Sequence, residues 1–213
     1  AQGWISPRAM RNGIIVTVLF ACLIGSALLF YAGWELIIVG LLCVLFAFLY
    51  TTGPYPLSYN GWGDVLVIVF FGFVPVGGTY YVQALTWTSD TTVASLICGL
   101  LIDTLLVVNN YRDREADARS GKRTVIVRFG EKFGRYLYLM LGVTASLLCF
   151  WFFFEGHLFA ALLPLLYLIP HVLTWRRMVQ IHSGKKLNSI LGETSRNMLL
   201  MGILLSIGFL IRH

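Results

Sequence analysis

Three oxygen-bearing side chains recur at intervals of four residues near the middle of the chain: Asn109, Asp113 and Asp117. On a helix each step of four residues turns the side-chain direction by only about 40°, so the three would line one face. Carboxylate and amide oxygens suit Mg²⁺, which keeps several waters and commonly shares its site with substrate phosphates. The spacing therefore predicts a magnesium site, with Asp113 and Asp117 as catalytic ligands and Asn109 as the third.

Basic residues surround these acids and could hold phosphate groups. They are Arg112, Arg114, Arg119, Lys122, Arg123 and Arg128. Gly121 would let the chain turn so that Lys122 and Arg123 approach an anion. A solvated, salt-bridged helix end is the alternative interpretation of such a charge run. That alternative explains the bases but not the carboxylates beside an apolar span, where acids usually serve a function. We therefore expect Arg112, Lys122, Arg123 and Arg128 to bind substrate.

The elements that must position these residues are membrane helices. Hydrophobic residues make up 58% of the 213 residues and charged residues only 12%, against about 25% charged in soluble proteins. Seven apolar segments follow one another, most of them near the length that crosses a bilayer: 14–31, 36–50, 65–82, 92–108, 136–154, 158–175 and 197–211. We predict an all-α polytopic membrane bundle of about seven transmembrane helices, forming one domain over residues 1–213.

The distribution of basic residues predicts the orientation. Alternating the seven segments across the bilayer puts residues 1–13, 51–64, 109–135 and 176–196 on one side. These loops carry 2, 0, 8 and 5 Lys and Arg residues, which is 15 of the 16 in the chain, and Arg212 is the other. Basic loops face the cytoplasm, so the net charge of +6 reflects topology and does not indicate nucleic-acid binding.

Other polar and special residues predict local features within the spans. Ser6 followed by Pro7 has the pattern of a helix N-terminus. Pro75 with Gly72 predicts a kinked, closely packed third span. Asp103 lies inside the fourth apolar segment, where a charge is costly, so we expect it to be buried, paired or protonated. It could line a cavity, but the sequence assigns it no role.

The stretch NNYRDREADARSGKRTVIVRFG, residues 109–130, resembles the second aspartate-rich motif of the UbiA superfamily of intramembrane prenyltransferases. Its Asn-Asn-x-Arg-Asp, Gly-Lys-x-Thr and Val-Arg-x-Gly elements are most similar to those of the dihydroxynaphthoate polyprenyltransferases of menaquinone biosynthesis. The stretch YTTGPYPLSYNGWGD, residues 50–64, resembles a loop of the same subfamily. The opening QGWISPRAM resembles the segment before the family's third helix.

The resemblance implies an Mg²⁺-dependent aromatic prenyltransferase in the bacterial inner membrane. Its substrates would be a polyprenyl diphosphate and dihydroxynaphthoate, and its product demethylmenaquinone. The family fold has nine transmembrane helices and two aspartate-rich motifs. The chain is therefore expected to be truncated at its N-terminus, with two further helices and the first motif just upstream of Ala1. The fragment alone would then have half a metal site and be inactive.

The resemblance also implies roles for two residues of the 50–64 stretch. Tyr50 stands where the family keeps a tyrosine beside the diphosphate cavity, and an aromatic face there would stabilise an allylic cation. An interfacial belt tyrosine is the alternative for Tyr50, and the favoured one for Tyr55, Tyr59 and Tyr111. Asp64 would bind or deprotonate the aromatic acceptor, or would stabilise the N-terminus of its helix.

Three rival functions stay open at this point. The chain could use another aromatic acceptor within the same superfamily. It could be a membrane transporter with Asp103 on its transport route, although this leaves the Asn109, Asp113 and Asp117 spacing unexplained. It could also be a non-catalytic truncated homologue.

Overall fold

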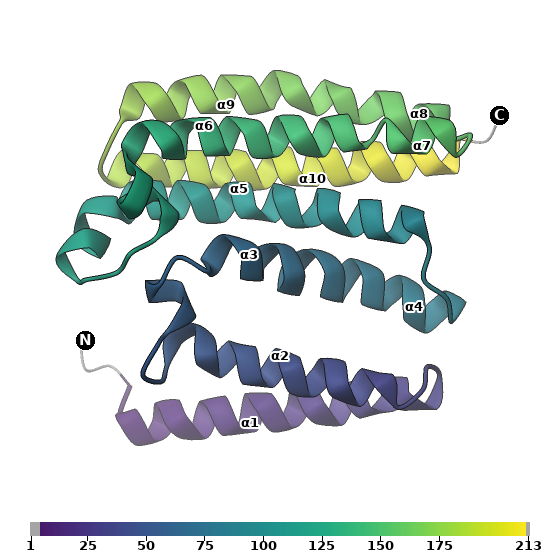
Figure 1. The fold of residues 1–213 in the computed structure, drawn as a ribbon, viewed down its shortest axis with the longest axis horizontal. Helices are drawn as coiled ribbons and strands as arrows, with labels where there is room; N and C mark the ends of the chain where they lie inside the picture. The colour runs from purple at the N-terminus through teal and green to yellow at the C-terminus, as the bar shows by residue number, and fades with distance from the viewer. Residues whose placement is uncertain (1–4, 212–213) are drawn as a thin grey trace.

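The computed structural model describes residues 5–211, so expectations that involve Ala1 to Trp4 or Arg212 lie outside the described residues. Every regular element within 5–211 is helical (Figure 1). The elements run in this order: α1 (Pro7–Ser26), η1 (Ala27–Phe30), α2 (Glu35–Thr51), η2 (Leu57–Tyr59), α3 (Gly63–Val67), η3 (Ile68–Gly77), α4 (Gly78–Ala84), α5 (Ser89–Arg119), α6 (Val125–Leu148), α7 (Trp151–Phe154), α8 (Leu158–Leu162), η4 (Leu163–Tyr167), α9 (Leu168–Ile181), η5 (Lys185–Leu187) and α10 (Asn188–Leu210).

Membrane crossing follows from the length and composition of these helices. Within the described residues six helical segments are long and apolar enough to span a bilayer, and α2 is a shorter apolar helix. Large apolar side chains face outward, as Leu19 and Leu23 do with 63% and 68% of their surface exposed. Apolar surface of this extent suits contact with lipid, because soluble monomers expose little contiguous apolar area. The prediction of an all-α polytopic bundle with about seven helices is confirmed.

Helix α5 is the centre of the bundle and packs against α6, η3 and α10. The predicted fourth span, residues 92–108, continues as one helix to Arg119. Thr88 caps its start by accepting a hydrogen bond from the Thr91 amide at 3.2 Å. The segment contains no proline to interrupt it. The charged residues from Asn109 to Asp117 are therefore helical, as their spacing predicts.

The third span is irregular and lies very close to α5. Its middle part, η3, is a π-helix that contains Pro75, whose missing amide hydrogen disturbs regular helical bonding. A Cβ atom added to Gly72 would lie 2.5 Å from the Ser95 carbonyl oxygen and 2.8 Å from the Gly99 Cα. Only glycine fits at this contact, so the predicted close packing is confirmed.

Helices α1 and α2 form a hairpin at one edge of the bundle (Figure 1). The predicted start of α1 is confirmed, because Ser6 Oγ accepts a hydrogen bond from the Ala9 amide at 3.2 Å and Pro7 occupies the first turn. The hairpin touches the rest of the fold where the Phe46 and Phe70 rings lie 5.2 Å apart between centroids.

The fifth span starts earlier than its apolar segment predicts. Helix α6 begins at Val125, capped by Thr124 through the Val127 amide. Gly130, with φ of 87°, then breaks the helix before the span itself. The short helical segment before Gly130 is apolar apart from Arg128 but far too short to cross a bilayer, so a search for apolar spans could not show it.

Candidate functional site

Two connections meet at the end of the bundle that carries most of the basic residues. One joins α2 to α3 and the other joins α5 to α6. The Arg123 amide donates to the Tyr59 carbonyl oxygen at 2.7 Å, and Arg128 Nη2 donates to the Asn60 carbonyl oxygen at 2.7 Å. Gly121 turns the second connection with φ of 77°. These contacts hold the two connections together over the end of α5.

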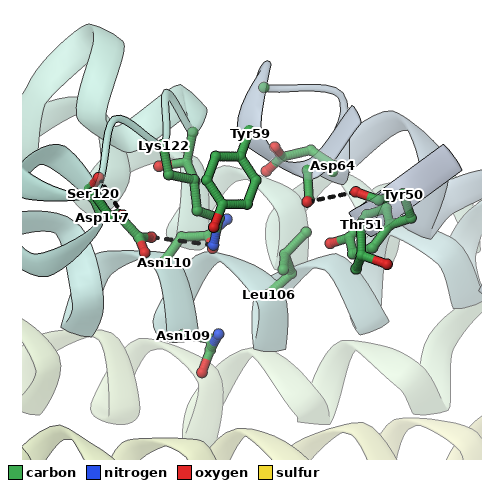
Figure 2. A pocket seen from close by; sticks show the side chains of 14 residues that line it. Tyr50, Thr51, Tyr59, Asp64, Leu106, Asn109, Asn110, Asp117, Ser120 and Lys122 are labelled. Carbon is green, nitrogen blue, oxygen red and sulfur yellow. Dashed lines mark hydrogen bonds and ion pairs between the residues drawn. The ribbon is translucent and has the colours of Figure 1, made fainter. Parts of the chain in front are cut away.

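A cavity of about 390 Å³ lies under these connections. Figure 2 shows Asp117, Ser120, Lys122 and Asn110 at one end, which we call the ionic end. Asp64, Tyr50 and Thr51 lie at the other end, which we call the acid end. The complete lining is Tyr50, Thr51, Ser58, Tyr59, Gly61, Gly63, Asp64, Leu106, Asn109, Asn110, Asp117, Ser120, Lys122 and Thr124.

The ionic end is built around an ion pair at the C-terminus of α5. Lys122 Nζ lies 3.3 Å from Asp117 Oδ2, and only 14% of the Asp117 side chain is exposed. The Lys122 amide and Ser120 Oγ both donate to the Asp117 carbonyl oxygen, at 2.9 Å each, which closes the last turn of the helix. The partial negative charge of a helix C-terminus favours cations here.

Asn109 and Asp113 are linked by one guanidinium group. Arg112 Nε and Nη2 donate to the two Asp113 carboxylate oxygens at 2.7 and 2.6 Å. Arg112 Nη2 also donates to Asn109 Oδ1 at 2.7 Å, and Nη1 donates to Asn188 Oδ1 of α10 at 2.9 Å. Asn109 lines the cavity, whereas Asp113 lies beside it, outside the lining.

The oxygens of the three predicted magnesium ligands can be compared with what Mg²⁺ requires. Within residues 5–211 no group of three or more His, Cys, Asp or Glu side chains is placed to hold a metal ion. Asn109, Asp113 and Asp117 instead supply two carboxylates and one amide, and in each case a cationic side chain binds their oxygens. These residues fit Mg²⁺ that takes its remaining ligands from water and phosphate, so the metal site stays a prediction compatible with the geometry.

The predicted phosphate-binding residues occupy different places. Lys122 lines the cavity. Arg112 lies beside it and orients Asn109. Arg123 is exposed and contributes its backbone to the loop contact, whereas the Arg128 side chain anchors the loop through Asn60. The sequence gives no sign of this anchoring, because the contact joins positions 68 residues apart.

At the acid end, two predicted residues face the cavity. Tyr50 presents its hydroxyl toward Gly63, where an added Cβ would lie 3.5 Å from it, and Ser58 Oγ donates to the Tyr50 carbonyl oxygen at 2.6 Å. Asp64 lies in the first turn of α3, but the N-cap residue is Trp62 and no side chain caps the helix. The buried Asp64 Oδ1 accepts no hydrogen bond from any residue in 5–211. Asp64 is therefore available to a ligand.

The three other tyrosines near the site lie in different surroundings. Tyr59 lines the cavity, and Tyr55 is 56% exposed. Tyr111 is fully buried outside the lining and donates to Glu131 at 3.1 Å.

Asn110 is a buried polar residue of the cavity that sequence reasoning missed. It is 3% exposed and lies in the lining beside Asp117. The signal was present, because residues 110 and 117 are seven apart and differ in direction by only about 20° on a helix. Residues 109 and 117 are eight apart and differ by about 80° in direction. A pattern that takes every fourth residue from Asn109 therefore leaves out Asn110, although Asn110 points closer to the direction of Asp117.

Comparison with known proteins places the chain among prenyltransferases. Residues 1–207 match the UbiA prenyltransferase family. A 1,4-dihydroxy-2-naphthoate octaprenyltransferase of Haemophilus influenzae is 34% identical over 99% of this chain and 70% of that protein. The enzyme of that name from Escherichia coli is 38% identical over 70% of this chain and 50% of that protein. A 2-carboxy-1,4-naphthoquinone phytyltransferase of Synechocystis is 26% identical over 63% of this chain and 45% of that protein. No solved structure matches the chain significantly.

Proposed function

Because this chain belongs to the UbiA prenyltransferase family, we propose that it transfers a polyprenyl group from an allylic diphosphate to an aromatic acceptor. The acceptor in this proposal is dihydroxynaphthoate, which the names of the Haemophilus influenzae and Escherichia coli relatives contain, and the product is demethylmenaquinone. The chain spans 70% of the length of the first relative and half of the length of the second, so the activity of those whole proteins enters here as part of the proposal. The observation that carries the proposal is one cavity with an ionic end and an acid end.

The ionic end binds the diphosphate. Lys122 Nζ and the Asn110 amide reach into the cavity from two elements, and both can donate to phosphate oxygens. The Lys122 amine, which contacts Asp117 in the structure, also contacts the diphosphate leaving group. This contact strengthens as negative charge develops on the bridging oxygen. Arg112 keeps Asn109 and Asp113 oriented from the side of α10.

Asn109, Asp113 and Asp117 would hold Mg²⁺ at the ionic end. Bound there, the ion would neutralise the diphosphate and make it a better leaving group. The chain itself supplies the oxygens, the cation-favouring helix C-terminus and the walls that limit access of water.

The acid end receives the aromatic acceptor. Tyr50 lies beside Asp64 at the acid end and offers an aromatic face to the allylic cation, an interaction worth about 0.5–2 kcal/mol. Asp64 has a buried oxygen without a partner in the described chain and binds a hydroxyl of the acceptor. The prenyl chain extends into lipid between the helices.

The site faces the cytoplasm of a bacterial inner membrane in this proposal. Support comes from the basic segments 109–135 and 176–196, which gather at the end of the bundle that holds the cavity. Transport with Asp103 on the route is the weaker alternative, because the lining holds an ion pair and amides suited to phosphate.

The test is prenyl transfer by membranes that contain the full-length protein. Labelled polyprenyl diphosphate is offered with dihydroxynaphthoate and, in parallel, with 4-hydroxybenzoate or homogentisate. We expect a prenylated naphthoate product that requires Mg²⁺. Prenylation of another acceptor alone would refute the naphthoate assignment, and solute flux without diphosphate release would support transport instead.

A further inference from the structure

A second acid lies directly behind the acid end of the cavity. Asp103 on α5 is 1% exposed, and its Oδ1 accepts no hydrogen bond from any residue in 5–211. An ionised carboxyl at such a position in a membrane protein is costly unless it is paired or functional. The function proposed above does not use Asp103, so its burial needs its own explanation.

The helix register places Asp103 opposite Asp64. A Cβ at Gly99 would meet the Ile68 carbonyl oxygen at 2.9 Å and the Ile68 Cα at 3.0 Å, so residues 68 and 99 face each other. Helices α3 and α5 run antiparallel here (Figure 1). One step of four residues along each helix therefore brings residue 64 opposite residue 103. The two carboxyl groups interact electrostatically, and both act on the Tyr50 hydroxyl.

The two unpartnered oxygens define the kind of ligand that fits. Asp64 Oδ1 and Asp103 Oδ1 are both buried hydrogen-bond acceptors. Leaving such a group without a hydrogen-bond donor disfavours the folded state. A diphosphate carries acceptors and negative charge, so it cannot satisfy them. A hydroxylated aromatic acceptor brings the O–H donor that they lack.

We propose that Asp64 and Asp103 form an acid pair that takes up the hydroxyl proton of the aromatic acceptor. Asp64 contacts the acceptor, and Asp103 is the positioning residue behind it. Two interacting carboxylates cannot both stay charged in this water-poor interior without a large penalty. The more deeply buried Asp103 keeps one proton and donates it as a hydrogen bond to Asp64. This inference rests on the proposed function.

Every proton and electron pair of this step is accounted for. The acceptor O–H bond breaks and its proton goes to Asp64. The ring carbon forms a bond to the allylic carbon, whose bond to the diphosphate oxygen breaks, and the electron pair leaves with the diphosphate. The ring carbon then releases its former substituent, as carbon dioxide from a carboxylate or as a proton to water. Asp64 returns its proton to the ring oxygen, and the pair is restored.

Two substitutions of Asp103 separate this role from a structural one. Asp103→Leu removes the donor, and Asp103→Asn keeps an N–H donor in its place. Loss of assisted proton transfer costs about 10²–10⁴-fold in rate. We expect kcat with the aromatic acceptor to fall about 100-fold in Asp103→Leu and less than tenfold in Asp103→Asn, with the KM for prenyl diphosphate within twofold of wild type.

Thermal stability provides a readout independent of activity. Asp103→Leu removes a buried side-chain oxygen that has no hydrogen-bond partner in the described chain, and burying such an oxygen disfavours the folded state, so the melting temperature of this variant should equal or exceed that of wild type. The matched control is Ser95→Ala, which removes another buried, unpartnered side-chain oxygen from α5. This control should leave the kinetics with both substrates unchanged.

The results that overturn the inference are distinct from those that refute the proposed function. An active wild type with unchanged acceptor kinetics in both Asp103 variants refutes the acid pair alone. Lower melting temperatures in both variants, with both KM values raised, assign Asp103 a structural role and also refute it. A wild type without prenyl transfer refutes the proposed function, and this inference with it.

Discussion

Replacement of Lys122 by alanine probes the diphosphate end of the cavity. Lys122 Nζ lies 3.3 Å from Asp117 Oδ2, and 22% of its side chain is exposed, so the amine is partly shielded from water. A hydrogen bond to a charged group contributes about 1.5–3 kcal/mol. Since 1.4 kcal/mol corresponds to a factor of ten, Lys122→Ala should raise the KM for prenyl diphosphate about 10- to 100-fold.

The assay is labelled prenyl transfer with each substrate varied in turn. The KM for the aromatic acceptor should change less than threefold, because Lys122 lies at the opposite end of the cavity from Asp64 (Figure 2). Lys186→Ala is the matched control, since Lys186 is an exposed base in the connection between α9 and α10. It removes the same charge at the protein surface without touching the cavity.

Two results would refute the assignment of Lys122. The first is an unchanged KM and kcat for prenyl diphosphate in Lys122→Ala. The second is an equal rise in KM for the Lys186 control, which would mean that general surface charge attracts the anion and that the cavity contact has no special role.

Four further substitutions test other parts of the site and the helix packing that supports it. Asp117→Ala and Asp113→Ala should each lower turnover at least 100-fold while leaving membrane insertion intact, and Mg²⁺-dependent activity retained in either would remove that residue from the ligand set. Gly99→Val should destabilise the protein by about 1–3 kcal/mol through overpacking, seen as a lower melting temperature, and a wild-type melting temperature would contradict the close helix contact. Arg128→Ala removes the 2.7 Å hydrogen bond to the Asn60 carbonyl oxygen and should raise the KM of both substrates several-fold, whereas an effect on prenyl diphosphate alone would show that Arg128 contacts the substrate directly.

The fold and the helical conformation of residues 109–117 were predictable from the sequence because both depend on local periodicity. Apolar segment lengths specify the spans, and the spacing of Asn109, Asp113 and Asp117 needs only a continuous helix, which α5 provides. Gly121 was expected to turn the chain, and it does so with φ of 77°. In these cases the nearest residues in the sequence decide the structure.

Contacts between distant parts of the chain were not predictable in this way. The anchoring of Asn60 by Arg128 spans 68 residues, and nothing in either segment specifies the other. The placement of Asp103 opposite Asp64 depends on the register that Gly72 and Gly99 set between two helices. Sequence reasoning could state that Asp103 would be buried, paired or protonated, and the structure shows that it is buried, but it could not state what Asp103 faces.

The most direct measurement counts both products of one reaction. Membranes containing the full-length protein are incubated with labelled polyprenyl diphosphate, dihydroxynaphthoate and Mg²⁺, and the prenylated naphthoate and the released diphosphate are quantified together. We predict one diphosphate for each prenylated product, with both lost in Asp117→Ala. Absence of a prenylated product in the wild type would contradict the proposed chemistry. Formation of both products by Asp117→Ala in the amounts that the wild type makes would contradict the proposed site.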